Sequence, residues 1–528
     1  MQGGEPEGGF KPAFVRQATG LVRELSSLDV FVWSIIFFPW LTSWVGIFWL
    51  TPDYYTNVNY YASLALWAVI AIVVVLLYWQ LTSVMPRSGG DYIFISRTLS
   101  GWVGFVASFL FLLAILVSAG SGSYWAFSEA GIQLSFAGQM LHNAAMASLG
   151  NTFTPGAPGA FTWGMMAAGL AILSVGTGLV IVGGRALKVV LYSFFAYGAL
   201  AMLLTLGLLV TSSHQAFVTD YGNYFQGGVA AVFSQASAAG YTPGATLASV
   251  GAVVPILFVS IGPYPVMQFV GGEIRRPKRS LLYGLVLAQL FSTAVWFGLT
   301  YELDRVVGLS FIEAWAKSTG GGFSTVPTAF ATVLNPNATL LWLIVVGLFI
   351  GNIGWSWLAL IFIGRLFMAW SFDRVVPSWL ASVSDRFHTP VNALFFAAVL
   401  AVIPMYLVYF TSFITAQVNA ILFYSIVWFL AAVSAIVIPY SRRDVYAAVT
   451  GGRGIPFLSL LGVLGAVLFA YLGYVSLTNS AIGPFAFSAQ VFTVASLVVP
   501  IGIYLVSYYL NKRRGIRLSL LYSEIPPE

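Results

Sequence analysis

Long stretches without a charged residue dominate this sequence. Asp53 and Arg87 bound one such stretch, Arg97 and Glu129 bound the next, and further stretches follow. The later ones cover residues 130–184, 221–272, 318–364, 387–441 and 454–511. A bilayer core needs about 20 apolar residues for each helical crossing, so every stretch can hold one crossing or two. Only 8% of the residues are charged, whereas soluble domains carry about 25%. The pattern therefore predicts an all-α membrane protein.

Apolar runs bounded by Gly, Pro, Asn or charged residues predict about twelve transmembrane helices. The expected spans are residues 28–50, 58–84, 103–129, 160–182, 189–212, 249–271, 280–301, 339–370, 391–409, 416–439, 457–478 and 487–510. The first span begins too late and runs too long for a cleaved signal peptide, so we expect it to be retained.

The basic residues orient these spans. With the N-terminus placed in the cytoplasm, 21 of the 23 Lys and Arg residues fall on inner segments, and Arg305 and Lys317 fall outside. Basic residues near helix ends favour the cytoplasmic side of a membrane. We therefore expect both termini in the cytoplasm and the chain in the cell (plasma) membrane. The net charge of +6 then requires no nucleic-acid partner.

Three outer segments are longer than ordinary loops. Residues 130–159 and 213–248 carry almost no charge, and residues 302–338 are amphipathic. We expect short helices on the outer surface there. Asp29 and Glu129 lie near the ends of expected spans and are interpreted as interfacial, so a deeply buried carboxylate relay is not expected.

Two spans contain helix-breaking residues well inside the apolar run. Pro39 lies near the middle of the first span, and Gly262, Pro263 and Pro265 lie in the sixth. Proline removes a backbone donor and clashes with the preceding turn. Non-helical backbone at membrane depth is tolerated where it lines a cavity, and paired interruptions in two halves of a chain point to a transporter binding site. For Pro39, a simple kink and a functional break stay equally open; for residues 262–265 we expect a break.

The sequence lacks the clustered residues that a metal-dependent or cofactor-dependent enzyme site needs. There is no cysteine, and the three histidines, His142, His214 and His388, are dispersed in expected loops. Metal or haem ligation therefore has almost no ligands, and no GxxxxGK[ST] phosphate-binding loop occurs. We expect no enzyme activity, no metal and no cofactor.

Three loops resemble those of amino acid–polyamine–organocation permeases. MPRSGGDY at residues 85–92 is similar to their PRSGGEY-type loop, and GEIRRPKR at residues 272–279 is similar to their GEVKNPKR loop. Residues 365–390, with RLF, DRVVP and RFHTP, resemble their SRLLYAMARDGLLP…RFKTP stretch. Three motifs in order, each between the matching pair of spans, identify a divergent member over residues 28–440.

This resemblance implies the LeuT-type fold, with a 5+5 inverted repeat and two C-terminal helices. The implied units are a cytoplasmic tail (1–25), a first repeat (26–212), a second, inverted repeat (249–440), two peripheral helices (456–510) and a second tail (511–528). It also implies a secondary transporter of amino acids or related amines that works by alternating access. The sequence predicts no oligomeric state.

In such permeases the substrate lies where the first and sixth helices unwind. The carboxylate meets free amides at a half-helix N-terminus, and the ammonium faces carbonyl groups. The implied substrate-binding residues here are Pro39, Thr42, Ser43, Ser260, Gly262, Pro263 and Tyr264. Thr42 and Ser43 could instead bond their own backbone, and Tyr264 could serve only in packing.

Further candidates lie around these breaks. Phe258 and Trp44 are candidate gating aromatics, and Asn352 and Ser356 are a possible ion or polar site. Asn352 could also serve in interhelical hydrogen bonding. The implied cytoplasmic gate consists of Arg87, Glu273 and Arg365, which could instead only fix the topology.

The sequence departs from the family pattern at both breaks. The first span retains a single glycine, Gly46, after Pro39, and no carboxylate follows Gly262. Lys188 lies at the inner end of the fifth span rather than inside it. The substrate and the coupling ion, H⁺ or Na⁺, therefore stay open. The alternative is a non-transporting sensor or membrane subunit of a larger complex, with the breaks filled by Trp40, Trp44 and Tyr264.

Overall fold

The computed structural model describes residues 20–37, 48, 51, 55–262, 265–318, 327–411, 416–450, 457–479 and 483–524. Pro39, Trp40, Thr42, Ser43, Trp44, Pro263 and Tyr264 lie outside this set, as does the side chain of Ser260. Within the described residues the fold is all-α, with short 3-10 turns and three isolated β-bridges.

Ten helices in the described part are long and apolar enough to cross a membrane. They are α3 (Tyr60–Val84), α5 (Gly101–Met140), α7 (Thr162–Val182), α8 (Gly184–Val210), α12 (Pro277–Val306), α15 (Ala338–Phe372), α16 (Val391–Phe410), α17 (Ala416–Ser441), α19 (Phe457–Thr478) and α20 (Phe487–Arg513). Two shorter apolar helices, α1 (Ser27–Phe37) and α11 (Ala248–Ile261), stand where the first and sixth spans are expected. The helix order therefore follows the predicted spans.

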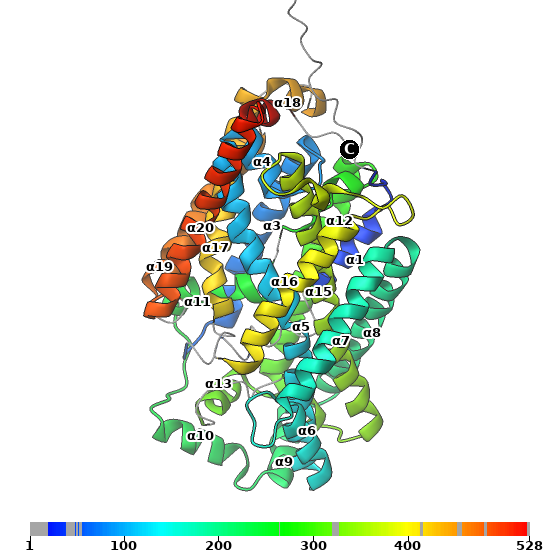
Figure 1. Cartoon of the computed structure of the whole chain (residues 1–528). Coiled ribbons are helices and arrows are strands. Elements are labelled where there is room, and N and C mark those ends of the chain that lie inside the picture. Colours follow the sequence, from blue (N-terminus) through cyan, green and yellow to red (C-terminus); the bar gives the residue numbers. More distant parts are fainter. Residues whose placement is uncertain are drawn as a thin grey trace, which may run out of the picture.

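The connecting segments separate to the two ends of the bundle (Figure 1). One end carries α4 (Asp91–Thr98), α18 (Arg443–Thr450) and α21 (Leu518–Ser523). The opposite end carries α6 (Ala144–Phe153), α9 (His214–Tyr224), α10 (Gly228–Ala238) and α13 (Leu309–Ser318). Segments predicted to share a side of the membrane thus lie at the same end, and the predicted short outer helices are present. We call the α4 end the inner end and the α6 end the outer end.

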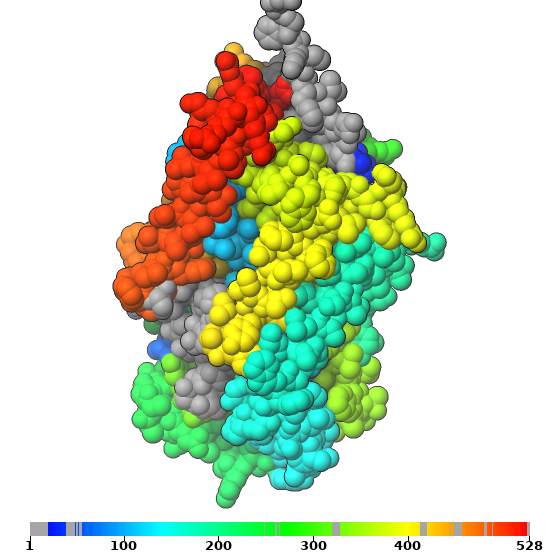
Figure 2. Space-filling view, viewed as in Figure 1, coloured from blue at the N-terminus to red at the C-terminus, as the bar shows by residue number. Residues whose placement is uncertain are grey.

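Helices α5 and α15 form the centre of the bundle. In each, 72% of the most apolar window is buried, whereas only 11% of that window is buried in α20. A methyl group added at Gly122 of α5 would lie 2.4 Å from Ser356 Cβ of α15, so the two backbones approach closely, as small residues allow in membranes. Figure 2 shows α16 crossing the visible face diagonally, between α19–α20 on one flank and α7–α8 on the other. The peripheral place of α20 agrees with its exposure.

The structure corrects the interpretation of Glu129. Helix α5 does not end there but continues for another 11 residues to Met140, and Glu129 is only 2% exposed. The sequence-based boundary was wrong because a single carboxylate was taken as the end of the apolar run. Asp29 does lie in the first turn of α1, as expected, but it too is only 2% exposed. Its carboxylate accepts hydrogen bonds from Lys188 Nζ at 3.2 Å and Tyr192 Oη at 2.8 Å. Both acidic side chains are therefore buried within the protein.

Candidate functional site

The sixth span is interrupted where Gly262 predicts a break. Helix α11 ends at Ile261, and Gly262 has φ +54° and ψ −169°, a combination that residues with a Cβ atom avoid. Past Pro265 the chain forms two 3-10 turns, η2 (Met267–Phe269) and η3 (Gly271–Glu273). A helix resumes only with α12 at Pro277. Backbone groups at this depth must therefore find partners outside the helix.

One of these backbone groups has a partner from another helix. Trp67, seven residues into α3, is fully buried, and its indole N–H donates to the Gly262 carbonyl oxygen at 2.5 Å. The indole satisfies an acceptor that the interrupted helix leaves free. Sequence analysis missed this role, because Trp67 lies 195 residues from its partner and no local pattern marks it.

Helix α1 is the described part of the first span, and residues 38–47, with the expected break at Pro39, lie outside the described residues. Helix α1 ends at Phe37, whose ring meets Phe362 of α15 at 5.3 Å between centroids. The same Phe362 ring lies 6.2 Å from Phe269 of η2, and Phe269 stacks on Phe111 of α5 at 4.6 Å. These four aromatic rings bring the end of α1 and the segment after Gly262 against one patch of the central helices. The described end of α1 and the segment after Gly262 therefore meet at α5 and α15.

Phe258 lies one turn before Gly262 but does not turn toward α1. Its ring packs 5.3 Å from Trp428 of α17 and 6.3 Å from Phe469 of α19, and it is 1% exposed. Its gating role stays a prediction.

Asn352 and Ser356 both face α5. The Asn352 side-chain N–H group donates to Glu129 Oε2 at 2.9 Å, and the Ser356 hydroxyl donates to the Ala119 carbonyl oxygen at 2.6 Å. These bonds serve helix association. The Glu129 carboxylate therefore lies beside the expected ion or polar site, although Glu129 was not among the candidate site residues.

Two of the three predicted inner-gate residues form an ion pair. Arg365 of α15 donates from Nε to Glu273 Oε1 at 2.8 Å and from Nη2 to Oε2 at 3.0 Å. This fork geometry is the strong form of an Arg–carboxylate contact. Arg365 Nη1 is buried without a hydrogen-bond partner among the described residues. Arg87 lies in the neighbouring loop, where its Nη1 donates to the Pro86 carbonyl oxygen at 3.1 Å.

Backbone pairing reinforces this contact. Both Glu24 and Leu25 donate N–H bonds of 2.9 Å to the Glu273 carbonyl oxygen, and Arg275 returns one of 2.8 Å to Leu25. On the other side Gly89 donates to the Phe269 carbonyl oxygen at 3.2 Å. The N-terminal segment and the loop after α3 thus hold residues 269–275 between them.

A cavity of about 410 Å³ opens beside the ion pair. Its lining includes Glu273, Arg365, Lys188, Arg386 and the buried Trp33 of α1. Charged side chains therefore border a cavity between α1, α8 and α15 at the inner end.

Asp91 is a second buried carboxylate that sequence analysis left unused. It begins α4 and accepts hydrogen bonds from Tyr78 Oη at 2.7 Å and from Gln268 Nε2, in the interrupted span, at 3.2 Å. Burial raises the pKa of Asp91 from 3.8 to about 7, although the two hydrogen bonds partly offset it. The loop reaches this position because Gly90 has φ +59° and a Cβ there would lie 2.6 Å from the Phe269 ring. The end of the 85–92 motif therefore touches the sixth span directly.

A buried ion pair joins α4 to the turn after α15, and the C-terminal segment packs over it. Arg97 of α4 binds Asp373 after α15 at 2.5 and 2.7 Å, and Tyr92 Oη donates to the same carboxylate at 2.7 Å. Tyr522 of α21 lies over the Arg97 guanidinium, 5.4 Å from ring centroid to Cζ. The contact lets α21 cover the end of α4, as cation–π pairs do.

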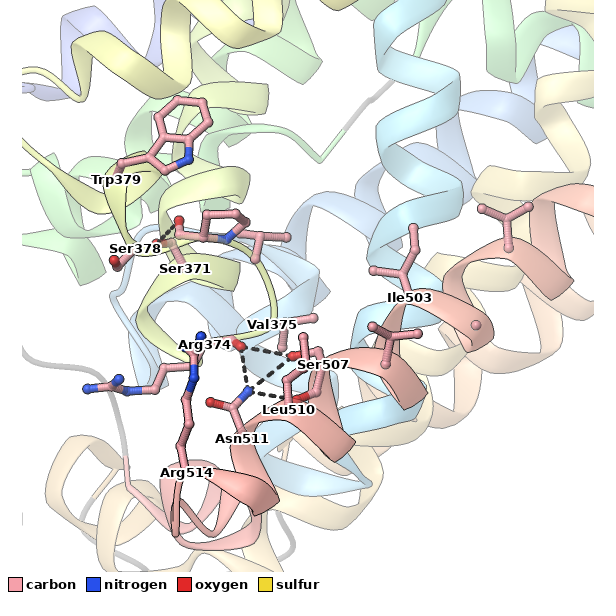
Figure 3. A pocket seen from close by; sticks show the side chains of 15 residues that line it. Ser371, Arg374, Val375, Ser378, Trp379, Ile503, Ser507, Leu510, Asn511 and Arg514 are labelled. Carbon is pink, nitrogen blue, oxygen red and sulfur yellow. Dashed lines mark hydrogen bonds between the residues drawn. The ribbon is translucent and has the colours of Figure 1, made fainter.

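A larger cavity, of about 750 Å³, lies away from the interruptions, between α20 and the turn after α15. Ser507 and Asn511 of α20 each donate to the Arg374 carbonyl oxygen at 2.9 Å (Figure 3). These bonds attach the peripheral helix to the core. The cavity is apart from the site formed by α1, α11, α5 and α15.

Comparison with known proteins agrees with this arrangement. A family model described as "Amino acid permease" matches residues 32–500, which include every spanning helix except the ends of the first and last. A search of curated proteins finds no match.

Proposed function

The chain belongs to the amino acid permease family, and from that premise we propose that it transports amino acids or related amines across the cell membrane by alternating access. The substrate would bind at the interruptions of the first and sixth spans. Residues 38–43 and 260–265 supply the backbone there, with Thr42, Ser43, Ser260 and Tyr264 as contributing side chains. Phe258 and Trp44 would gate this site.

The observation that carries the proposal is the interruption at Gly262. Helix α11 has 14 residues, or about 21 Å of helix, which is too short to cross a bilayer core of about 30 Å. Broken helices at the midplane place free N–H and C=O groups in a position to bind a zwitterion. Trp67 already binds the Gly262 carbonyl oxygen, so the substrate would meet the neighbouring groups.

The inner end supports alternating access. The Glu273–Arg365 pair and the backbone bonds of Glu24 and Leu25 tie the interrupted span to α15 and to the N-terminal segment. For release into the cytoplasm these contacts would separate and widen the cavity beside Arg365. Arg87 would assist as part of the loop that pairs with residues 269–271. We infer that the inner end, with both termini, faces the cytoplasm.

Uptake into proteoliposomes tests the proposal. The purified chain is reconstituted and offered a pool of labelled amino acids and amines, with a sodium gradient, a proton gradient or no gradient. We expect at least one pool member to accumulate or to exchange, and to raise the melting temperature of the protein. If no pool member accumulates, exchanges or shifts the melting temperature, the chain is not such a transporter, and the sensor or subunit alternative stands in its place.

A further inference from the structure

Glu129 is a buried carboxylate inside the long central helix α5. It lies 11 residues before the outer end of α5, about 16 Å along the helix. Its partner Asn352 lies 14 residues after the outer end of α15, about 21 Å along. Glu129 is 2% exposed. Acidic residues buried inside transmembrane helices are rare and mark ion or proton pathways.

The partner of Glu129 is neutral. Asn352 donates to Glu129 Oε2 at 2.9 Å and to the Leu348 carbonyl oxygen at 3.1 Å. A side-chain amide carries both a donor and an acceptor, so Asn352 can bond a carboxylate through N–H and, after rotation, a carboxylic acid through C=O. An ionised carboxylate that meets only an amide lacks the compensating charge that burial demands. The pair therefore suits a group that gains and loses a proton.

The neighbouring helices bring no positive charge to Glu129. Helices α6, α7 and α14 (Pro327–Val333) have no ionisable side chain. On α15 the nearest basic residue is Arg365, 13 residues further on and paired with Glu273. Helix α16 adds tyrosines, of which Tyr409 donates to Ser123 at 3.3 Å; α5 itself adds Tyr124.

Helix α13 meets the outer part of α5, where Trp315 lies 6.1 Å from Phe136, and it carries Glu313 and Lys317. The remaining helices that touch α5 do so nearer its inner end. Helix α4 packs there with Arg97 held by Asp373. Helix α17 contacts Phe111 through Tyr424, and α20 contacts Phe105 through Tyr504. Phe111 precedes Glu129 by 18 residues, about 27 Å along α5. Among the described residues, then, Glu129 forms no salt bridge, and the neutral Asn352 is its side-chain hydrogen-bond donor.

A row of polar side chains leads from Glu129 toward the outer end. Gln133 lies one turn further along the same face of α5. Its side chain accepts a hydrogen bond from Thr328 Oγ1 at 2.7 Å and donates to Thr332 Oγ1 at 3.2 Å. Thr328 and Thr332 belong to α14 in the outer segment. All three are buried, and their hydrogen bonds join the turn of α5 that follows Glu129 to α14 of the outer segment.

We propose that the Glu129 carboxyl binds the proton whose movement is coupled to substrate transport. The proton enters from the outer end along the row of Thr328, Thr332 and Gln133 and adds to a Glu129 carboxylate oxygen. It leaves the same oxygen for water at the inner side when α5 and α15 rearrange. This inference rests on the proposed function, and it assigns the coupling ion as H⁺ rather than Na⁺.

Substrate accumulation and substrate exchange by the variant Glu129→Gln test this assignment. Proteoliposomes holding a pH-sensitive dye receive labelled substrate from the pool under an inward proton gradient. We expect the wild-type chain to accumulate substrate and acidify the lumen. Glu129→Gln, which imitates the protonated state, should keep exchange of labelled for unlabelled substrate but lose both accumulation and acidification. Glu302→Gln, which removes a carboxylate at the outer end of α12, should behave as the wild type.

Two transport results would contradict this assignment. Proton-driven accumulation by Glu129→Gln, or wild-type accumulation that ignores the proton gradient, would overturn the assignment. If the wild-type chain moves no pool member even by exchange, the proposed function fails. Infrared spectroscopy then still tests whether Glu129 binds a proton. One component of the carbonyl band of buried carboxylic acids should appear in the wild type and in Glu302→Gln and be missing from Glu129→Gln, while the component from Asp91 remains. An identical spectrum for wild type and Glu129→Gln would exclude proton binding at Glu129.

Discussion

At the residue scale, two buried carboxylates differ in what neutralises them. Asp29 accepts a hydrogen bond from the charged Lys188, whereas Asp91 accepts hydrogen bonds from the neutral side chains of Tyr78 and Gln268. The pKa of Asp91 rises from 3.8 to about 7 because burial disfavours its charge. Asp91 lies beside the interrupted span, so its charge state acts directly on the contact between the 85–92 loop and Gln268.

This shift makes the stability of the chain pH-dependent. The pKa of Asp91 is higher in the folded chain than in the unfolded one, so folding takes up a proton and stability falls as pH rises from about 4 to about 7. At higher pH the cost reaches at most about 4 kcal/mol. Asp91→Asn removes that cost, so its melting temperature should exceed that of the wild type by several degrees at ~pH 8 and by little at ~pH 5.

Thermal unfolding in detergent at both pH values measures the effect. The exposed Asp385 supplies the control, since Asp385→Asn should retain the wild-type pH dependence. An Asp91→Asn variant that loses stability with rising pH as steeply as the wild type would show that Asp91 is not responsible.

At the element scale, the inner end is closed by contacts between segments rather than by a single helix. The Glu273–Arg365 pair joins η3 to α15, with side chains 12% and 5% exposed. Removing one partner of such a pair leaves a buried charge, at a cost of about 3–5 kcal/mol. Because the pair would break in an inward-open state, its loss favours that state over the closed one.

Thiol labelling can follow this opening, since the chain has no cysteine. Ile361 lines the inner cavity and is 1% exposed, so Ile361→Cys gives a single reporter. We expect a membrane-impermeant maleimide to label it faster when Glu273→Gln is added. Glu302→Gln, which breaks the Glu302–Arg305 pair at the outer end, should leave the rate unchanged. Equal labelling rates with and without Glu273→Gln would exclude the pair as a gate.

At the scale of the whole molecule, the sequence predicts the number and order of the spans well. Lipid as solvent forces each crossing to be an apolar helix, so hydrophobicity alone gives their places. The break at Gly262 is also predictable, because Pro and Gly act locally. The membership in the amino acid permease family agrees with the three loop motifs.

The sequence does not predict which residues of distant helices contact each other. Trp67 and Gly262 are 195 residues apart, Glu129 and Asn352 are 223 apart, and Arg97 and Asp373 are 276 apart. Such pairs arise only when the helices pack. The sequence-based boundary at Glu129 was wrong for a related reason: α5 continues for 11 residues beyond Glu129, and a single charge inside a helix resembles a helix end in the sequence.

The central claim is that transport depends on the interrupted sixth span at Gly262. Uptake and exchange of a transported pool member by Gly262→Val, reconstituted beside the wild type and Gly298→Val, test it most directly. At Gly262 the φ of +54° excludes valine without strain, whereas a Cβ at Gly298 in α12 meets no atom within 4 Å. We predict that Gly262→Val remains folded by size-exclusion chromatography but neither takes up nor exchanges substrate, while Gly298→Val transports normally. Wild-type transport by folded Gly262→Val would contradict the account.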